Sequence, residues 1–142
     1  MRFWRSRKEV SDEPEHLVAG RWGEDLGATF LKNGGMKILG KRVHVGKKDE
    51  IDVLARDGEI LVFVEVKTRR SEDFGRPISA VDRDKQYRLS RAAVRYMEKM
   101  KNKPAYFRFD VIEVIGEPGD EEPEIRHIPN AFQLSEPFRV TW

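Results

Sequence analysis

The chain has 142 residues, of which 39% are hydrophobic and 37% are charged, and it contains no cysteine. This length suits one domain with a substantial core, and the lack of cysteine excludes disulfides and thiolate zinc sites. No apolar segment reaches the roughly 18 residues that a membrane-spanning helix needs, and the basic N-terminus lacks the apolar core of a secretory signal. We therefore expect a cytoplasmic protein without a membrane partner.

The formal net charge of +2 hides a strong asymmetry along the chain. Residues 1–66 carry equal numbers of acidic and basic side chains, residues 67–108 carry 13 basic and 5 acidic ones, and residues 109–142 carry 2 basic and 8 acidic ones. A positive region beside carboxylates attracts a polyanion. Nucleic acid, with DNA favoured, is the expected partner.

The first predicted helix follows an N-terminal arm, residues 1–13, that we expect to be mobile and basic. Pro14 can open a helix, and an apolar stripe predicts that the helix covers residues 15–33, with Gly34-Gly35 as its stop. Three glycines inside the helix would each cost about 1 kcal/mol relative to alanine. Their expected role is close packing of the helix on a sheet, and Glu24 lies among them.

Three strands are predicted next. Residues 36–45 form the first strand. Residues 49–56 alternate in polarity, and residues 60–64 form an apolar run that indicates a buried strand. The two segments meet at Asp57 and Gly58, a strong hairpin signal, so we expect an antiparallel pair.

The register of this hairpin brings polar residues together. If the turn consists of the two residues Asp57-Gly58, Asp52 pairs with Phe63 and Glu50 pairs with Glu65. Directly opposed residues share a face, so four polar side chains share one face of an apolar hairpin: Glu50, Asp52, Glu65 and Lys67. Carboxylates beside a lysine suit a hard divalent cation and a phosphodiester. Metal-dependent cleavage of nucleic acid is the leading hypothesis, with Mg²⁺ or Mn²⁺ as the cofactor.

A second helix is predicted over residues 80–102, with Ser79 as its N-cap and Pro104 beyond its end. Basic residues recur along it at three- and four-residue steps: Arg88, Arg91, Arg95 and Lys99. This ridge is either a solvated face or a contact surface for phosphates, and phosphate contact is the favoured reading because few acids balance it.

The remaining elements complete an α/β order. Residues 106–115 form a strong β-strand, and residues 125–129 form a short edge strand. Helix, three strands, helix and strand predict a mixed sheet flanked by helices. We expect residues 14–115 to be the core domain and residues 116–142 to be an acidic loop with a C-terminal extension.

At the hairpin, the sequence resembles the PD-(D/E)xK nuclease superfamily. Ile51-Asp52 stands at the Pro-Asp position, and Glu65-Val66-Lys67 matches ExK. Four longer blocks within roughly residues 17–115 are similar to the YraN-like family, which is often described as similar to Holliday-junction resolvases: GRWGEDLGATFLKNGGMKIL, DEIDVLARDGEILVFVEVKTRR, FGRPISAVDRDKQYRL and YFRFDVIEV. One departure is visible, since Asp49 replaces the usual glycine of Gly-Glu-Ile-Asp.

The resemblance implies a restriction-endonuclease-like αβββαβ core and a metal-dependent endonuclease that hydrolyses DNA, with branched DNA as one candidate substrate. It implies that Asp52 and Glu65 ligate the metal together with the carbonyl of Val66. Lys67 would orient or deprotonate the attacking water, and Glu24 would supplement the metal site.

The expected nucleic-acid contacts combine this resemblance with the basic loop after the hairpin. Lys85 and Gln86 match a position that often faces the active site in the superfamily. The full set is Arg69, Arg70, Arg76, Lys85, Gln86 and Arg88. Three alternatives stay open: a structural ion pair in place of the metal site, a catalytically silent nucleic-acid-binding module of the same fold, and a protein-interaction domain. A homodimer also stays open, because a four-way junction presents two equivalent strands to a resolvase-like enzyme.

Overall fold

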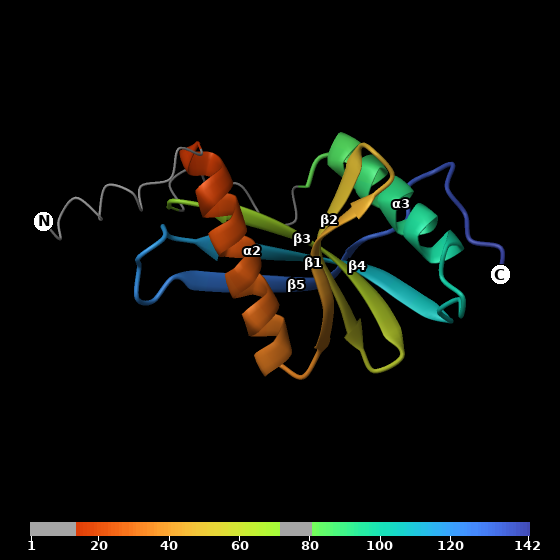
Figure 1. The fold of residues 1–142 in the computed structure, drawn as a ribbon, viewed down its shortest axis with the longest axis horizontal. Coiled ribbons are helices and arrows are strands. Elements are labelled where there is room, and N and C mark those ends of the chain that lie inside the picture. The colour runs from red at the N-terminus through yellow and green to blue at the C-terminus, as the bar shows by residue number, and fades with distance from the viewer. Residues whose placement is uncertain (1–13, 72–80) are drawn as a thin grey trace, which may run out of the picture.

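The structure is a computed structural model, and it describes residues 14–71 and 81–142 (Figure 1). The N-terminal arm expected over residues 1–13 lies outside the described residues. The described elements, in chain order, are α2 (Glu15–Asn33), β1 (Lys37–Val45), β2 (Asp49–Asp57), β3 (Ile60–Arg69), α3 (Arg83–Glu98), β4 (Tyr106–Ile115) and β5 (Glu124–Phe132).

The five strands form one mixed sheet in the order β1-β2-β3-β4-β5. β3 and β4 run parallel and are connected through α3, while the other neighbouring pairs are antiparallel. Consecutive antiparallel strands need only short turns, whereas a parallel pair needs a crossover. This topology confirms the predicted α/β class and the restriction-endonuclease-like αβββαβ order, to which β5 adds an edge strand.

Each face of the sheet packs against one helix. Side chains alternate along β3, so Leu61 and Phe63 join a core cluster with α3, whereas Val62 and Val64 join a second cluster with α2. Figure 1 shows the two helices apart from each other, with the strands running between them. Within the described residues, neither helix is long and apolar enough to cross a bilayer.

Glycines allow α2 to lie close to the sheet. A Cβ atom added at Gly23 would collide with the hydroxyl of Thr68 on β3, and one at Gly27 would lie 3.4 Å from Val66. The prediction of close packing is confirmed at Gly23 but is wrong for Gly20, where an added Cβ meets nothing within 4 Å. Because Gly23 brings the helix against β3, its neighbour Glu24 is held near the sheet.

The turn of the hairpin begins one residue later than predicted, and this changes the register of the two strands. Asp57 pairs with Ile60 and Leu54 pairs with Phe63, so the predicted pairings of Asp52 with Phe63 and of Glu50 with Glu65 are wrong. The turn residues are Gly58 and Glu59. Gly58 has φ +61°, which is required at the first central position of a type II′ turn. The partners have shifted by two residues, and such a shift does not change the face of a side chain. At Asp52, however, the alternation is interrupted, because Ile51 packs in the cluster with α3 and Val53 packs in the cluster with α2.

The second helix is shorter than predicted. α3 begins after Asp82, whose side chain accepts a hydrogen bond from the backbone N–H of Lys85 at 2.8 Å. The proposed cap Ser79 lies outside the described residues. At the other end, the ammonium group of Lys103 donates to the carbonyl oxygens of Met97 and Met100 at 3.0 and 2.9 Å. These side-chain caps satisfy backbone groups that the helix leaves open, and so the helix ends before residue 102.

Candidate functional site

The site lies where β2 and β3 separate. Their ladder ends at the pair Val53 and Val64, and beyond it β2 continues toward α3 while β3 runs toward the first turns of α2 (Figure 1). Asp52 is the next residue of β2. Its Oδ2 accepts the backbone N–H of Val66 at 2.9 Å, so a side chain occupies a position where a neighbouring strand would offer a carbonyl. This bond holds the Asp52 carboxylate in the fork.

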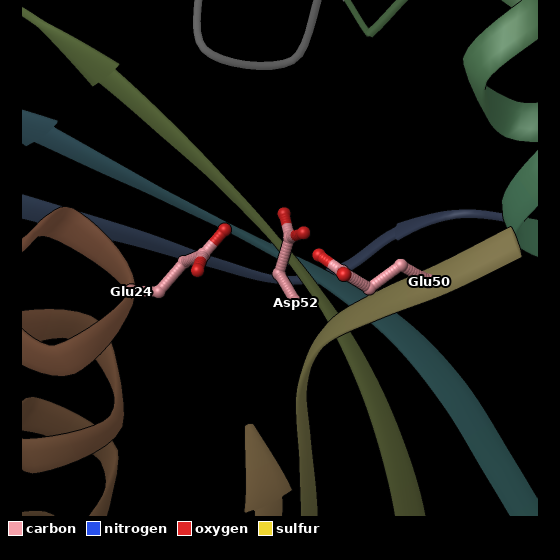
Figure 2. Close-up of side chains that lie close together, drawn as sticks. All are labelled: Glu24, Glu50 and Asp52. Carbon is pink, nitrogen blue, oxygen red and sulfur yellow. The ribbon is translucent and has the colours of Figure 1, made fainter. Parts of the chain in front are cut away.

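Three carboxylates converge at this fork. One ligand oxygen from each of Glu24, Glu50 and Asp52 lies within 4.8 Å of the other two. Figure 2 shows Glu24 reaching from α2 toward Asp52, with Glu50 approaching from the other side along β2. Asp52 and Glu24 are half-buried and Glu50 is exposed. The three groups, named here the carboxylate cluster, come from two elements that are far apart in the sequence.

Arg42 on β1 is the nearest cation on the α2 side of the carboxylate cluster. Its Nη1 lies 3.0 Å from Glu24 Oε1, and its guanidinium also bonds Asp25 at 3.3 Å. Arg42 has φ +50°, an uncommon value for a residue with a side chain. In the β1–β2 ladder, Lys41 pairs with Val53 and Val43 pairs with Ile51. Arg42 therefore lies opposite Asp52.

Burial and mutual repulsion change the protonation of the carboxylate cluster. Burial, followed by the negative charge of Glu65, raises the pKa of Asp52 well above its usual value, against the hydrogen bond from Val66. Burial also raises the pKa of Glu24, and the charge of Glu50 adds to the effect while Arg42 opposes it. Burial therefore disfavours the charged form of both carboxylates, and the charges of neighbouring acids add to this effect, so a proton or a metal ion would stabilise them.

Glu65 and Lys85 form an ion pair on the α3 side of the fork. Glu65 is buried on β3, and its Oε2 lies 3.3 Å from Lys85 Nζ. Lys67, two residues further along the strand, is half-buried. The pKa of Asp82 is lowered by the backbone N–H of Lys85, and the charge of Lys67 contributes to the same shift. Because residues two apart on a strand share a face, Lys67 lies on the side of Glu65, which faces Lys85 on α3.

A cavity of about 220 Å³ lies at the fork, beside part of the site. It combines four acids with three cations and one apolar side chain, and its lining residues are Lys48, Asp49, Glu50, Asp52, Glu65, Lys85, Arg88 and Leu89. Glu24 and Lys67 are absent from this lining. A cavity with this lining can hold a cation at its acidic end and a phosphate near its basic rim.

Other expected nucleic-acid contacts are held elsewhere. Arg69 Nε lies 2.9 Å from the buried carboxylate of Glu113. Arg70 pairs with Glu15 at 3.3 Å and with Glu117 at 3.4 Å. Both arginines line a separate cavity of about 770 Å³ between the start of α2 and the connection after β4. Their proposed phosphate contacts stay predictions, and phosphates would have to compete with these ion pairs.

The expected helix residues differ in their surroundings. Gln86 donates from Nε2 to the carbonyl oxygen of Val81 at 2.7 Å, so its amide is used near the start of α3. Arg88 is exposed at the rim of the 220 Å³ cavity. Arg76 lies outside the described residues. The Val66 carbonyl stays a predicted ligand, while the N–H of the same residue binds Asp52.

One residue was missed as a member of the site, and another was not assigned as a ligand. Glu50 was placed on the correct face by the strand alternation that it shares with Asp52, but it was not included among the metal ligands. Asp49 lines the same cavity and accepts two hydrogen bonds from Arg91, at 2.9 and 2.8 Å. The bonds from Arg91 lower the pKa of Asp49 against the effect of its burial. The departure from the family pattern therefore adds a charge that Arg91 neutralises.

The fold and the site define the class: an α/β protein of the restriction-endonuclease-like fold with carboxylates gathered at its strand fork. Residues 23–114 match the family described as "Uncharacterised protein family UPF0102". The chain belongs to this family, the YraN group of PD-(D/E)xK nuclease-like proteins, as its motifs predicted.

Relatives of the chain match it over most of their length. A UPF0102 protein of Geotalea daltonii is 45% identical over 121 residues, which cover 85% of this chain and 94% of the relative. A UPF0102 protein of Symbiobacterium thermophilum is 46% identical over 114 residues, with 80% and 94% covered. One of Geobacter metallireducens is 43% identical over 116 residues, with 82% and 93% covered. These names state no activity, so the function has to be argued from the site.

Proposed function

We propose that the protein is a divalent-metal-dependent nuclease that hydrolyses phosphodiester bonds in DNA, including branched DNA. The observation that carries this proposal is the carboxylate cluster, in which oxygens of Glu24, Glu50 and Asp52 lie within 4.8 Å of one another. Lysine and arginine side chains line a cavity together with Glu50 and Asp52. Phosphodiester hydrolysis needs both signs of charge side by side, because the metal site is negative and the substrate is a polyanion.

The donor set fits Mg²⁺ or Mn²⁺. These ions prefer oxygen ligands and are commonly bound through one or two carboxylates. Burial, together with the charges of neighbouring carboxylates, raises the pKa values of Asp52 and Glu24, and a bound cation would stabilise their ionised forms. We propose Asp52, Glu24 and Glu65 as ligands with the Val66 carbonyl, and we add Glu50. A bound ion would supply Lewis acidity and an acidified water.

The residues of the chain then have separate roles. Lys67 orients or deprotonates the attacking water from the β3 side, in the role that the resemblance assigns to it. Lys85 holds the Glu65 carboxylate at 3.3 Å and adds positive charge beside the cavity. Arg88 binds a phosphate oxygen at the rim, where its planar guanidinium can form two parallel hydrogen bonds.

One observation favours the alternative of a catalytically silent DNA-binding module. Two proposed ligands are already paired with protein cations, Glu24 with Arg42 and Glu65 with Lys85. A site that remains closed by its own ion pairs would bind DNA through its basic residues without holding a metal ion.

A cleavage assay separates the two functions. Linear, single-stranded and four-way DNA are incubated with the full chain in Mg²⁺, in Mn²⁺ and in EDTA. The proposed nuclease cleaves at least one substrate only when metal is present, and Lys67→Ala lowers the rate by about 10² or more. Asp25→Asn is the matched control, because Asp25 is exposed and lies beside Glu24 on α2 but outside the carboxylate cluster.

Metal binding is measured separately by thermal unfolding. A ligand that binds the folded state raises the midpoint, so Mg²⁺ should stabilise the unmodified chain and Asp25→Asn but not Asp52→Asn. Metal-dependent stabilisation without cleavage of any substrate would contradict the nuclease proposal and support the binding module.

A further inference from the structure

We infer that the β1–β2 turn and the outer edge of α3 form a binding track for the phosphate backbone of double-stranded DNA. The track, named here the phosphate track, consists of Lys47, Lys48, Arg88, Arg95 and Lys99. The inference rests on the proposed function for the choice of DNA as the partner. It keeps Arg88, Arg95 and Lys99 of the basic ridge expected from the sequence, removes Arg91, and adds Lys47 and Lys48 from the β1–β2 turn.

The cations of the phosphate track are unpaired within the described part of the chain. All five side chains are exposed, and Lys99 is also the residue that ends α3. No carboxylate of the described residues forms an ion pair with them. In contrast, six arginines elsewhere are engaged with acids: Arg42, Arg69, Arg70, Arg91, Arg108 and Arg126. Arg91 is removed from the predicted ridge because Asp49 binds it through two hydrogen bonds. The phosphate track is therefore a group of exposed cations that stay available to an anionic ligand.

The five cations lie on two adjoining elements. On α3, Arg95 and Lys99 follow Arg88 by seven and eleven residues, close to two and three helical turns, so the three side chains share one face over about 16 Å. The guanidinium of Arg95 lies beside Gly46 in the β1–β2 turn, 3.5 Å from where a Cβ would stand. Lys48 and Arg95 both act electrostatically on Asp49. The turn and the helix therefore present one continuous positive surface.

This surface leads into the candidate site. Lys48 and Arg88 line the 220 Å³ cavity together with Glu50 and Asp52. A backbone bound along α3 would therefore enter the cavity at its basic rim and meet the carboxylate cluster. A length of about 16 Å corresponds to roughly five base steps of a duplex strand, enough for several phosphates to bind at once.

Among the described residues, the aromatic rings beside the phosphate track already pack against other protein groups, which favours a duplex over a single strand. Surfaces that bind single strands interleave cations with aromatic side chains on which bases stack. Beside the phosphate track, Tyr87 packs against Phe138 with ring centroids 4.9 Å apart, and Arg91 lies over the same ring at 5.9 Å. Tyr96 is half-buried and packs edge-on against Phe63. The track thus offers charge without stacking, which suits a regular helical backbone.

The test is DNA binding by the full chain in EDTA, where the proposed metal-dependent cleavage cannot occur. Affinity for a labelled duplex of about three helical turns is measured by fluorescence anisotropy across a salt series. The variant Lys48→Gln/Arg88→Gln/Arg95→Gln removes three charges from the phosphate track. The matched control, Lys32→Gln/Lys37→Gln/Arg56→Gln, removes three exposed charges near the C-terminus of α2 and the hairpin end of β2. Thermal midpoints confirm that both variants fold.

Each phosphate contact contributes about 0.9 to the slope of log affinity against log salt concentration. We expect the track variant to bind at least about tenfold more weakly and to lower the slope by roughly 2 to 3, while the control binds as the unmodified chain does. Lys48→Gln alone should lower the slope by about 1.

Three outcomes would overturn the inference: an unchanged salt slope in the track variant, an equal loss in the control, or a clear preference of the unmodified chain for single-stranded DNA. These outcomes are independent of cleavage. Failure of the nuclease proposal with intact binding along the track would leave a DNA-binding module, whereas cleavage without the track effect would show that DNA enters by another surface.

Discussion

Replacement of Asp52 by asparagine removes one negative charge from the carboxylate cluster and almost preserves the side-chain shape. The amide oxygen of asparagine can still accept the N–H of Val66, which now lies 2.9 Å from Asp52 Oδ2. The main difference is therefore electrostatic: repulsion from Glu24, Glu50 and Glu65 is relieved. Without metal, we expect this variant to be more stable than the unmodified chain at neutral pH.

The magnitude follows from the separation of the charges. Two like charges 4.8 Å apart repel by about 1 kcal/mol in water and by about 3 kcal/mol at an effective dielectric constant near 20. Arg42 and Lys85 offset part of this repulsion. We therefore expect Asp52→Asn to raise the free energy of unfolding by about 1 to 2 kcal/mol in EDTA. In Mg²⁺ at ten times the dissociation constant, the unmodified chain gains about 1.4 kcal/mol, and the variant loses this gain.

The pH dependence gives the prediction a definite sign. The folded state raises the pKa of Asp52, so its contribution to stability is present below the unfolded pKa and is lost as the pH rises through the folded pKa. Urea denaturation in EDTA is measured from about pH 4 to about pH 8. The free energy of unfolding of the unmodified chain should fall as the pH rises, because the carboxylates ionise and repel one another, and that of Asp52→Asn should fall less.

Asp25→Asn is the control for the Asp52 variant. Asp25 is paired with Lys41 at 2.8 Å and has a lowered pKa because of that hydrogen bond, so its replacement should be neutral or slightly destabilising. A destabilised Asp52→Asn in EDTA, with the same pH profile as the unmodified chain, would refute the view that the carboxylate cluster is short of cations.

Two further predictions concern packing and the departure from the family pattern. Gly23→Ala should lower the free energy of unfolding by about 1 to 3 kcal/mol, because the added methyl collides with Thr68, whereas Gly20→Ala should stabilise the helix by up to about 1 kcal/mol. Equal urea midpoints for the two variants would contradict the packing of α2. Asp49→Asn should lower the thermal midpoint at neutral pH, because it removes the charge that Arg91 binds. The folded state lowers the pKa of Asp49, so its contribution to stability is present above the unfolded pKa and is lost as the pH falls through the folded pKa. A difference in thermal midpoint between Asp49→Asn and the unmodified chain that persists at acidic pH would contradict this reasoning.

Elements with strong local signals were predicted well. The helix Glu15–Asn33 and the strand Tyr106–Ile115 have the predicted bounds. In both cases apolar periodicity and terminal residues act over a few neighbouring positions, so the information is present in the segment itself. The boundaries of α3 were predicted less well, because Asp82 competes with Ser79 as a cap and Lys103 binds the final carbonyls.

The hairpin shows how a correct conclusion can survive a wrong register. The Asp57-Gly58 signal identified the turn, but the turn begins one residue later because Gly58 takes the position that needs a positive φ. Moving a partner by two residues preserves its face. The predicted grouping of Glu50 with Asp52 held because residues two apart on one strand share a face, although the individual cross-strand pairings were wrong.

The sequence by itself determined the α/β order, the family, the alternation that groups Glu50 with Asp52 on β2, and the excess of positive charge in residues 67–108. These properties follow from composition and from side-chain alternation, which act locally along the chain. Only the tertiary structure decided that Glu24 meets Asp52, that Lys85 binds Glu65, and which cations acids leave unpaired. Those contacts join elements far apart in the sequence, and they depend on how closely α2 and α3 pack on the two faces of the sheet.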